Sequence, residues 1–289
     1  MSLIICTKDR APQLQQCLKE IASASIPPCD FEIVLVDNGS KDSTRSVIQD
    51  FADTASLNVE CVECESPGSG LAKNFGISAS KGEWLLFTDD DCYVEKAYFL
   101  NFFEFVKACS TSTEATKEIR YGSGPIVLYD QQHDPRVANL TIEKIKFIPP
   151  KSLLAAGIVQ GANMFFHRSV FQNVGQFNEK MGAGTPFPCE DIEMAARASL
   201  AGFLGAQVPF FKVIHHHKRL IGSAEANATV ESYDYGRGAY YASLINSGFP
   251  QFWQLWESCS QLQNIKNPYF RMRLVRELEG AANYLKALK

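Results

Sequence analysis

The first 130 residues of the chain alternate between short apolar runs and segments with the period of a helix. The apolar runs lie at 2–7, 31–37, 59–64 and 84–89. Helical spacing is found at 11–22, after 43 and at 71–80. Strands and helices that alternate through short connections are typical of parallel βαβ units. Because the strands are apolar almost throughout, the sequence predicts an α/β fold whose sheet is covered by helices on both faces.

Composition limits the classes of function. The 289 residues carry a net charge of −4, so there is no excess of Lys and Arg to neutralise a nucleic acid. The nine cysteines have no regular spacing, and the CxxC pair at 61 and 64 lies in a predicted strand, which favours reduced thiols over a zinc or redox site. The sequence shows no secretion signal and no apolar run of about 18 residues. We expect a cytoplasmic protein without a nucleic-acid partner.

Beyond residue 130 the pattern changes. Residues 130–155 are irregular, whereas 158–166 and 206–214 have the pattern of extended segments and 190–200 that of a helix. The last 60 residues are mostly helical in pattern. The expected division is a main domain with a helical extension: 1–222 (halves 1–128 and 129–222), then 223–289.

Polar side chains follow several of the predicted strands. In parallel sheets, ligands gather at the carboxyl ends of the strands. The residues expected along this rim are Thr7, Asp9, Arg10, Asp37, Asn38, Asp89, Asp90 and Asp91. Three adjacent carboxylates repel one another, and a divalent cation would compensate them. Alternation would put Asp89 and Asp91 on one side of the chain, and a solvated acidic turn that caps the next helix is the alternative.

Six segments resemble motifs of the GT-A fold glycosyltransferases of family 2, in the order and spacing of that family. FTDDDC resembles the DxD motif, LIICTKDR the first strand with its nucleotide-contacting loop, and VLVDNGSKDST the second strand. GLAKNFGI resembles the GxxxARNxGI helix, with Lys73 where Arg is common, and GANMFFHR resembles the acceptor-side strand. MGAGTPFPCEDIEMAARASLAG resembles the GEDxDLxxR segment, with Cys189 in place of the usual Gly.

The resemblance implies a Rossmann-like mixed sheet of the GT-A type with helices on both faces, and the pattern adds a helical C-terminal extension. It also implies an inverting, metal-dependent hexosyltransferase that uses Mn²⁺ or Mg²⁺. Such an enzyme moves a sugar from a nucleotide diphosphate to a hydroxyl group in glycan or glycoconjugate synthesis. The acceptor would be a carbohydrate, a lipid-linked glycan or another hydroxyl compound, and the nucleotide base stays open.

The same resemblance implies roles for individual residues. Asp191 would be the catalytic base, and Glu190 would orient the acceptor. Asp91 and Asp89 would hold the metal, with His215 as a further ligand and His217 as its substitute. The residues implied in donor binding are Thr7, Asp9, Arg10, Asp37, Asn38, Lys73, Asn74, Asp89 and Asp90, with Gly161 and Asn163 in the sugar and acceptor walls.

Several of these roles have a plainer alternative. Asp37 can form an Asx turn at the end of its strand, and Glu190 and Asp191 suit the positive end of a helix dipole. His215 can be a neutral histidine with ordinary hydrogen bonds.

The C-terminal part matches no family motif. Its segment YDYGRGAYY could lie over the donor, with Arg237 near phosphate, or form a packed helix. Residues 271–289 are a candidate basic amphipathic helix, which would allow peripheral docking on a membrane or would form an ordinary solvated face.

Other classes of protein fit the sequence less well. A dinucleotide-dependent oxidoreductase is disfavoured because GSGL at 68–71 lacks the third glycine of GxGxxG and follows the third strand. Two alternatives remain: a nucleotidyltransferase, and a non-catalytic protein of the same fold that only binds nucleotide sugars.

Overall fold

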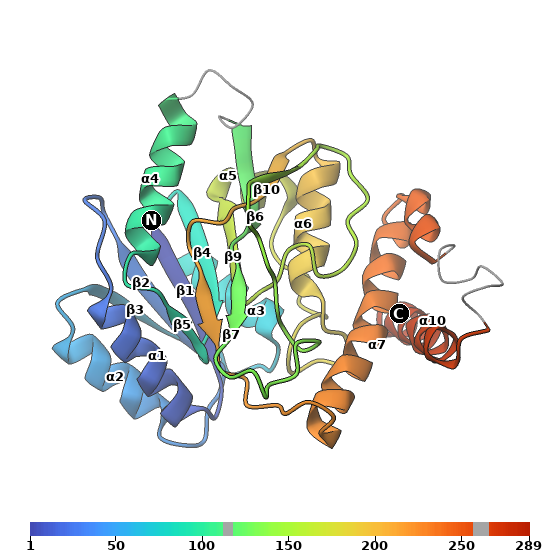
Figure 1. Cartoon of the computed structure of the whole chain (residues 1–289), viewed down its shortest axis with the longest axis horizontal. Coiled ribbons are helices and arrows are strands. Elements are labelled where there is room, and N and C mark those ends of the chain that lie inside the picture. Colours follow the sequence, from blue (N-terminus) through green and yellow to red (C-terminus); the bar gives the residue numbers. More distant parts are fainter. Residues whose placement is uncertain (112–117, 257–265) are drawn as a thin grey trace.

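The computed structural model of the protein describes residues 1–111, 118–256 and 266–289. Its main sheet has eight strands (Figure 1), in the order β3 (Asn58–Glu63), β2 (Glu32–Asp37), β1 (Ser2–Thr7), β4 (Trp84–Asp89), β9 (Asn163–His167), β6 (Ile119–Ser123), β10 (Leu204–Gln207) and β8 (Lys146–Ile148). The first four strands are parallel, whereas β9 runs antiparallel to its neighbours β4 and β6. The expected mixed α/β sheet is confirmed.

Helices cover both faces of this sheet because successive side chains of a strand point to opposite faces. Leu3 and Ile5 of β1 belong to one apolar core, which also holds residues of α1 (Ala11–Ser23), α2 (Thr44–Thr54) and α4 (Tyr98–Thr111). Ile4 of β1 belongs to the other core, which holds residues of α3 (Ser69–Ala79), α5 (Arg168–Val174) and α6 (Glu190–Leu200). The two cores fix the carboxyl ends of β1, β2 and β4 along one rim.

A second, three-stranded sheet lies beside this rim. Its order is β5 (Cys92–Val94), β11 (Val213–His215) and β7 (Ile126–Leu128). His215 at the end of β11 is paired in register with Cys92, directly after the acidic run. Residues from both halves of the main domain therefore meet at the end of β4.

Two of the expected extended segments were wrong in detail. Residues 206–214 do not form one strand, because the chain leaves β10 in the main sheet, turns at 209–212 and enters β11 in the small sheet. Residues 158–162 are not part of a strand either, and β9 begins only at Asn163. This turn brings Gly161 to the start of α6, where its backbone N–H donates to Asp191.

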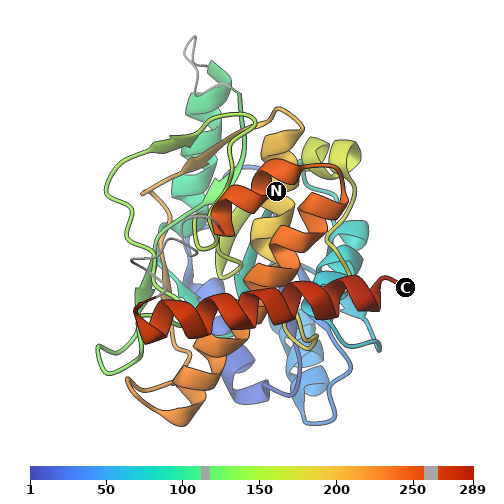
Figure 2. The same ribbon diagram turned by 90° about the vertical axis from the view of Figure 1, so that its right-hand side faces the viewer.

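The C-terminal part consists of α7 (Ala224–Asn246), the 3-10 helix η2 (Pro250–Trp253) and α10 (Pro268–Ala287). Figure 2 shows α10 running across α7 on the outside of the molecule. The helices touch through glycines: a Cβ atom on Gly238 would collide with the carbonyl oxygen of Glu277, and one on Gly280 with that of Tyr235. Such close backbone approach requires residues without a side chain.

Buried ion pairs join these two helices. Glu277 of α10 is fully buried and accepts from the Arg237 side chain of α7 at 2.8 Å and from Arg273 at 2.7 Å. Asp234 of α7 pairs with Arg237 and, at 3.3 Å, with Arg276. The guanidinium group of Arg237 thus pairs with two carboxylates, as expected for a packed helix.

The aromatic residues of the C-terminal part mostly belong to the core. Tyr240, Phe252 and Trp256 are buried in the same apolar cluster as α3 and α6, whereas Trp253 is 55% exposed. Because this core is shared with the sheet, a boundary at residue 222 stays a prediction. Among the residues described, the helices are too short or too polar to span a bilayer.

Candidate active site

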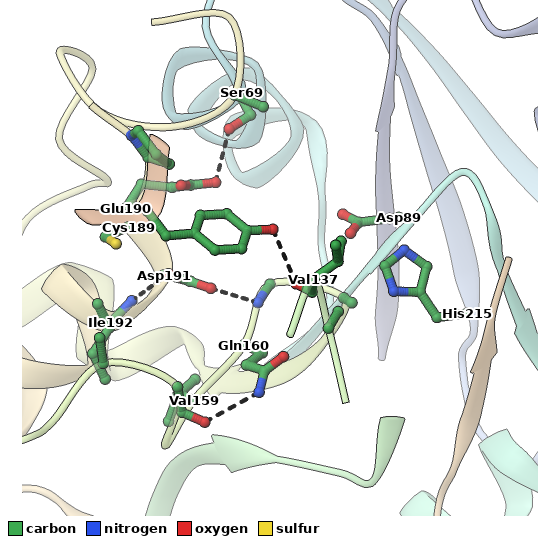
Figure 3. Close-up of a pocket in the computed structure, with 18 of the residues that line it drawn as sticks. Ser69, Asp89, Val137, Val159, Gln160, Cys189, Glu190, Asp191, Ile192 and His215 are labelled. Carbon is green, nitrogen blue, oxygen red and sulfur yellow. Dashed lines mark hydrogen bonds between the residues drawn. The ribbon is translucent and has the colours of Figure 1, made fainter. Parts of the chain in front are cut away.

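A cleft lies along the carboxyl ends of the parallel strands and consists of two adjoining cavities of about 390 and 350 Å³. The larger one, here called the α6 cavity, is lined by Gly161, Glu190 and Asp191 and is shown in Figure 3. The other, the β1 cavity, is lined by residues of the predicted rim. Seven residues line both cavities: Ser69, Lys73, Asp89, Val137, Ala183, His215 and Tyr233. The cavities are therefore two parts of one cleft.

The acidic run is fixed by residues from the end of β1. Thr7 donates its hydroxyl hydrogen to Asp90 at 2.6 Å, and Arg10 Nε lies 2.7 Å from the other oxygen of Asp90. The guanidinium group of Arg10 also pairs with Asp91. Burial raises the pKa of Asp90 to about 7, although the charge of Arg10 opposes this shift. The buried Thr7 and Asp90 thus form one network with the partly exposed Arg10 along the β1 cavity.

Asp89 and Asp91 form a second group with His215 and Cys92, in which the potential ligand atoms all lie within 4.8 Å of one another. His215 Nε2 lies 3.1 Å from Asp91, and the buried His215 Nδ1 has no hydrogen-bond partner among the residues that the structure describes. Burial opposes ionisation of Asp91, but hydrogen bonds and charges from His215 and Arg10 hold its pKa below the usual range. Burial and the charge of Asp91 raise the pKa of Asp89.

This group fits a divalent cation. Carboxylate oxygens and an imidazole nitrogen are suitable ligands for Mn²⁺ or Mg²⁺, and an unpartnered buried ring nitrogen indicates a polar group that the protein alone does not satisfy. Cys92 lines neither cavity, and burial raises the pKa of its thiol, so Asp89, Asp91 and His215 are the better ligands. An acidic partner for His215 was not apparent from sequence spacing, because Asp91 reaches it only through the pairing of β5 with β11.

His217 is not brought into this group. Its ring centroid lies 5.1 Å from that of His215, but its Nδ1 accepts the backbone N–H of Arg219 at 3.1 Å. His217 is buried and lines neither cavity, and burial together with neighbouring positive charge lowers its pKa to about 4. His217 is therefore a neutral residue that lies next to His215, outside the two cavities.

The start of α6 brings two carboxylates into the α6 cavity. Glu190 accepts hydrogen bonds from Lys73 Nζ at 2.6 Å and from the Ser69 hydroxyl at 2.7 Å, so it forms a buried ion pair. Asp191 accepts backbone N–H groups instead, from Gly161 at 2.7 Å and from Ile192 at 2.7 Å. Burial and then the charge of Glu190 raise the pKa of Asp191 to about 7. A carboxylate with such a pKa can accept a proton near neutral pH.

The residue before this helix has an unusual backbone. Cys189 has φ 93° and ψ 26°, a left-handed conformation that glycine adopts without strain. Its side chain lines the α6 cavity. The structure thus explains why the motif that this segment resembles usually has Gly at this position.

Other predicted site residues hold the loops around the cleft. Asn38 lines the β1 cavity, but its side-chain NH₂ group donates to the carbonyl groups of Cys64 and Ser66. Asp37 is buried, lines neither cavity and accepts the N–H of Ser40 at 2.9 Å, which is the turn interaction that the sequence left as an alternative. Asp9 is exposed, with φ 53°, and accepts the N–H of Lys41.

Two asparagines lie outside both cavities. Asn74 exchanges hydrogen bonds with the backbone of Phe177 at 2.9 and 3.0 Å. Asn163 accepts from the Tyr98 hydroxyl at 2.8 Å and donates to the carbonyl groups of Pro125 and Phe211. Both residues position segments that line the cleft, and direct donor contact by either remains a prediction.

Sequence reasoning missed several residues of the cleft. Ser69 and Val137 line both cavities, yet neither carries side-chain chemistry that stands out in a sequence. Tyr233 was within reach, since the segment YDYGRGAYY was considered as a cover for the donor. The structure places Tyr233 in both cavities, whereas Arg237 lines only the α6 cavity.

The chain is similar in sequence to known glycosyltransferases. Glycosyltransferase AglE of Haloferax volcanii is 27% identical over 205 residues, which are 70% of this chain and 62% of that protein. A PGL/p-HBAD biosynthesis glycosyltransferase of Mycobacterium bovis is 37% identical over 94 residues, 32% of this chain and 36% of the relative. The chain therefore spans less than two thirds of the length of these relatives.

Two solved structures share the fold. The mannosyltransferase PcManGT of Pyrobaculum calidifontis, in complex with GDP-Man and Mn²⁺, aligns with 100% of this chain and 87% of its own, at a TM-score of 0.63 and 15% identity. S. aureus TarS 1-349 with UDP-GlcNAc aligns with 98% of this chain and 80% of its own, at 0.63 and 16%. These alignments confirm the expected GT-A fold.

The family itself is shown by the sequence. The family model described as glycosyl transferase family 2 matches residues 2–175, which is more than half of the chain. The match covers the strands β1, β2 and β4 that end at the rim, together with β9. The chain therefore belongs to glycosyl transferase family 2.

Proposed function

We propose that this protein is an inverting, metal-dependent glycosyltransferase that moves a sugar from a nucleoside diphosphate onto an acceptor hydroxyl. One observation carries the proposal: a single cleft has the group of Asp89, Asp91 and His215 on one side and Asp191 on the other. The first group suits a cation bound to a diphosphate, and Asp191 suits the activation of a hydroxyl group. Membership of family 2 supports the same reaction.

The donor would occupy the β1 cavity. Asp89, Asp91 and His215 would hold Mn²⁺ or Mg²⁺, which supplies positive charge to the diphosphate as a Lewis acid. Thr7, Arg10 and Asn38 line this cavity and would lie next to the nucleotide. The complexes of PcManGT with GDP-Man and Mn²⁺ and of TarS with UDP-GlcNAc support a nucleotide-sugar donor and a metal ion.

Asp191 would act as the base in the α6 cavity. Its carboxylate is oriented by the N–H groups of Gly161 and Ile192, so it can take the proton of an acceptor hydroxyl. The acceptor oxygen then bonds to the anomeric carbon as the bond from that carbon to the diphosphate oxygen breaks on the opposite face. This arrangement inverts the configuration of the anomeric carbon.

Lys73 and Glu190 would support this step from the boundary of the two cavities. Lys73 is buried and lines both, so its positive charge lies near the expected position of the departing diphosphate. Glu190 fixes Lys73 through their ion pair and faces the acceptor side.

The acceptor would enter through the α6 cavity. Its wall combines apolar side chains, among them Val159 and Ile192, with the polar Asn139 and Gln160, which suits a carbohydrate. The names of AglE and TarS, the latter a poly(ribitol-phosphate) β-N-acetylglucosaminyltransferase, support a role in glycan or glycoconjugate synthesis.

Donor turnover without an acceptor tests the proposal. UDP-, GDP- and dTDP-sugars are incubated with the protein and Mn²⁺ or Mg²⁺, and the released nucleoside diphosphate is measured. We expect slow, metal-dependent release from the donors of one base and a large loss of release in Asp191→Asn. A protein that only binds nucleotide sugars would release nothing. A nucleotidyltransferase would react only when pyrophosphate is added, and it would then convert the nucleotide sugar to a nucleoside triphosphate and a sugar 1-phosphate.

We also propose that α10 contacts an anionic membrane surface. Its outward side exposes Met272, Val275 and Leu278, each by more than 40%, beside the exposed cations Arg271 and Lys286. Apolar side chains next to positive charge complement a bilayer that carries anionic lipids. This location would bring the cleft to a lipid-linked acceptor.

Vesicle binding tests this contact. The wild-type protein should sediment with vesicles that contain phosphatidylserine, and the Val275→Glu, Leu278→Glu double variant should remain in the supernatant. Ile221→Glu is a matched control, because Ile221 is exposed but lies outside α10. Equal sedimentation of all three proteins would contradict a role for α10.

A further inference from the structure

The two cavities of the cleft are separated by a contact between distant parts of the chain. The Tyr233 hydroxyl of α7 donates to the backbone carbonyl of Val137 at 3.0 Å, and both residues line both cavities. Val137 belongs to the irregular segment between β7 and β8. Figure 3 shows Val137 between Asp89 on one side and Asp191 on the other. The contact therefore lies across the path from the metal group to the base.

The proposed reaction requires the transferred sugar to cross this boundary. Asp91 and Asp90 line only the β1 cavity, whereas Asp191 and Glu190 line only the α6 cavity. The anomeric carbon must be bonded to the diphosphate on one side and reached by the acceptor oxygen on the other. A sugar ring in that position lies against the side chain of Tyr233.

We propose that Tyr233 is a sugar-contacting residue that positions the transferred sugar between the metal group and Asp191. This inference rests on the proposed function and extends it to a residue of the C-terminal helices. The Tyr233 hydroxyl that donates to the carbonyl of Val137 would donate to the sugar in the donor complex.

The chemistry of Tyr233 suits this role. An aromatic ring offers an apolar face to the C–H groups of a sugar, and its hydroxyl can bond to a sugar hydroxyl. Burial raises the pKa of Tyr233, so the hydroxyl keeps its proton and remains a donor. The charged groups Arg219, Asp89 and Asp191 lie around it, and these are the groups between which the sugar must be placed.

The helix that carries Tyr233 is firmly anchored. Asp234, the next residue, pairs with Arg237 and Arg276, and Ser223 caps the start of α7 by accepting the N–H of Ala226 at 3.1 Å. Arg136 next to Val137 also donates to Asn227 of α7 at 2.8 Å. The position of the phenol group is thus set by the C-terminal helices, which gives them a part in donor recognition.

Calorimetry with two ligands separates a sugar contact from a structural role. The nucleoside diphosphate and the corresponding nucleotide sugar identified by the release assay are each titrated, with Mn²⁺, into wild type and Tyr233→Ala. We expect unchanged affinity for the diphosphate and an affinity for the nucleotide sugar that is lower by about five-fold or more, the size expected for loss of one hydrogen bond and an aromatic contact.

The controls are a matched truncation and a smaller change. Tyr235→Ala removes the same group from the same helix at a residue that lines neither cavity, and it should leave both affinities unchanged. Tyr233→Phe keeps the ring and should lose about two-fold to five-fold of nucleotide-sugar affinity, which keeps the test valid if the alanine variant does not fold.

Two results would overturn the inference. Equal losses for the diphosphate and the nucleotide sugar in Tyr233→Ala would assign the residue a structural role. Unchanged affinity for both ligands would remove Tyr233 from the sugar site while the proposed function stands. If wild-type protein bound neither ligand, the proposed function itself would fall, and the inference with it.

Discussion

Asp191 is a carboxylate held by two backbone N–H groups, yet its pKa is raised to about 7. The hydrogen bonds favour the ionised form, but burial and the neighbouring charge of Glu190 outweigh them. The result is a group that is oriented by the backbone and can exchange a proton at neutral pH. Both properties depend on residues far apart in sequence, Gly161 and Lys73 among them.

Replacing the base tests its role at the residue level. Asp191→Asn keeps the shape of the side chain but cannot accept a proton, so transfer should fall by about 10² to 10⁴-fold. Binding of the nucleoside diphosphate should be unchanged, because Asp191 does not line the β1 cavity. Steady-state kinetics and calorimetry measure the two effects, and a variant with wild-type turnover would exclude Asp191 as the base.

The same variant has a defined effect on stability. A pKa raised on folding means that the folded protein holds a proton that the unfolded chain has lost, so stability falls as pH rises from about 4 to 7. Asp191→Asn lacks this titration and should gain roughly 1–3 kcal/mol relative to wild type over that window. Denaturation at several pH values measures the difference, and a constant difference would show that Asp191 has an ordinary pKa.

Glu190 should set the pH dependence of the reaction. Glu190→Gln removes a negative charge beside Asp191 and leaves the positive charge of Lys73 without its partner, and both changes favour the ionised form of Asp191. The rise of kcat/KM with pH should therefore move to lower pH than in wild type. A shift to higher pH would show that Glu190 does not act on Asp191 by its charge.

Cys189 allows a test of backbone strain. A side chain in the left-handed region costs roughly 1 kcal/mol compared with glycine. Cys189→Gly should therefore raise the free energy of unfolding by up to about 1 kcal/mol. The gain is reduced by the greater conformational entropy of glycine in the unfolded chain. Chemical denaturation measures the change, with Cys61→Ser on the exposed edge strand β3 as a control. A clear loss of stability would show that packing of the thiol outweighs the strain.

At the scale of elements, the regular part of the fold could be predicted from the sequence. The strands and helices expected in the first 90 residues agree with the structure to within two residues at each end. The apolar character of β1, β2 and β4 is strong because these strands are covered on both faces. The segments 158–162 and 209–212 were misread because apolar residues in turns, such as Phe211, are buried like those in strands.

At the crossing of α7 and α10, replacing glycine by alanine should lower the stability of the protein instead of raising it. In an ordinary helix, Gly→Ala stabilises by about 1 kcal/mol through helix propensity. Gly238→Ala should instead destabilise the protein by about 1–3 kcal/mol, because the new methyl group would meet the carbonyl of Glu277. Thermal melting measures the direction, and a rise in Tm would show that the two helices do not touch at this point.

At the scale of the whole molecule, the cleft is assembled from parts that carry unequal sequence signals. The carboxyl ends of β1 and β4 could be placed on one rim from topology alone, and the DxD and ED motifs were recognisable by resemblance. The walls come from the segment around Val137 and from α7, which have no motif and reach the cleft only through tertiary packing. For this reason Tyr233 was considered only as part of the segment YDYGRGAYY, which could lie over the donor, and Val137 was missed.

Calorimetric titration of UDP, GDP and dTDP, with and without Mn²⁺, tests whether this cleft binds a nucleotide with the help of a metal ion. Wild-type protein should bind one of these nucleotides in a metal-dependent way. Asp91→Asn should lose the metal dependence, and Asp191→Asn should retain it. Absence of binding to all three nucleotides with Mn²⁺ present, in a protein that melts cooperatively, would contradict the assignment of this cleft to a nucleotide-sugar donor.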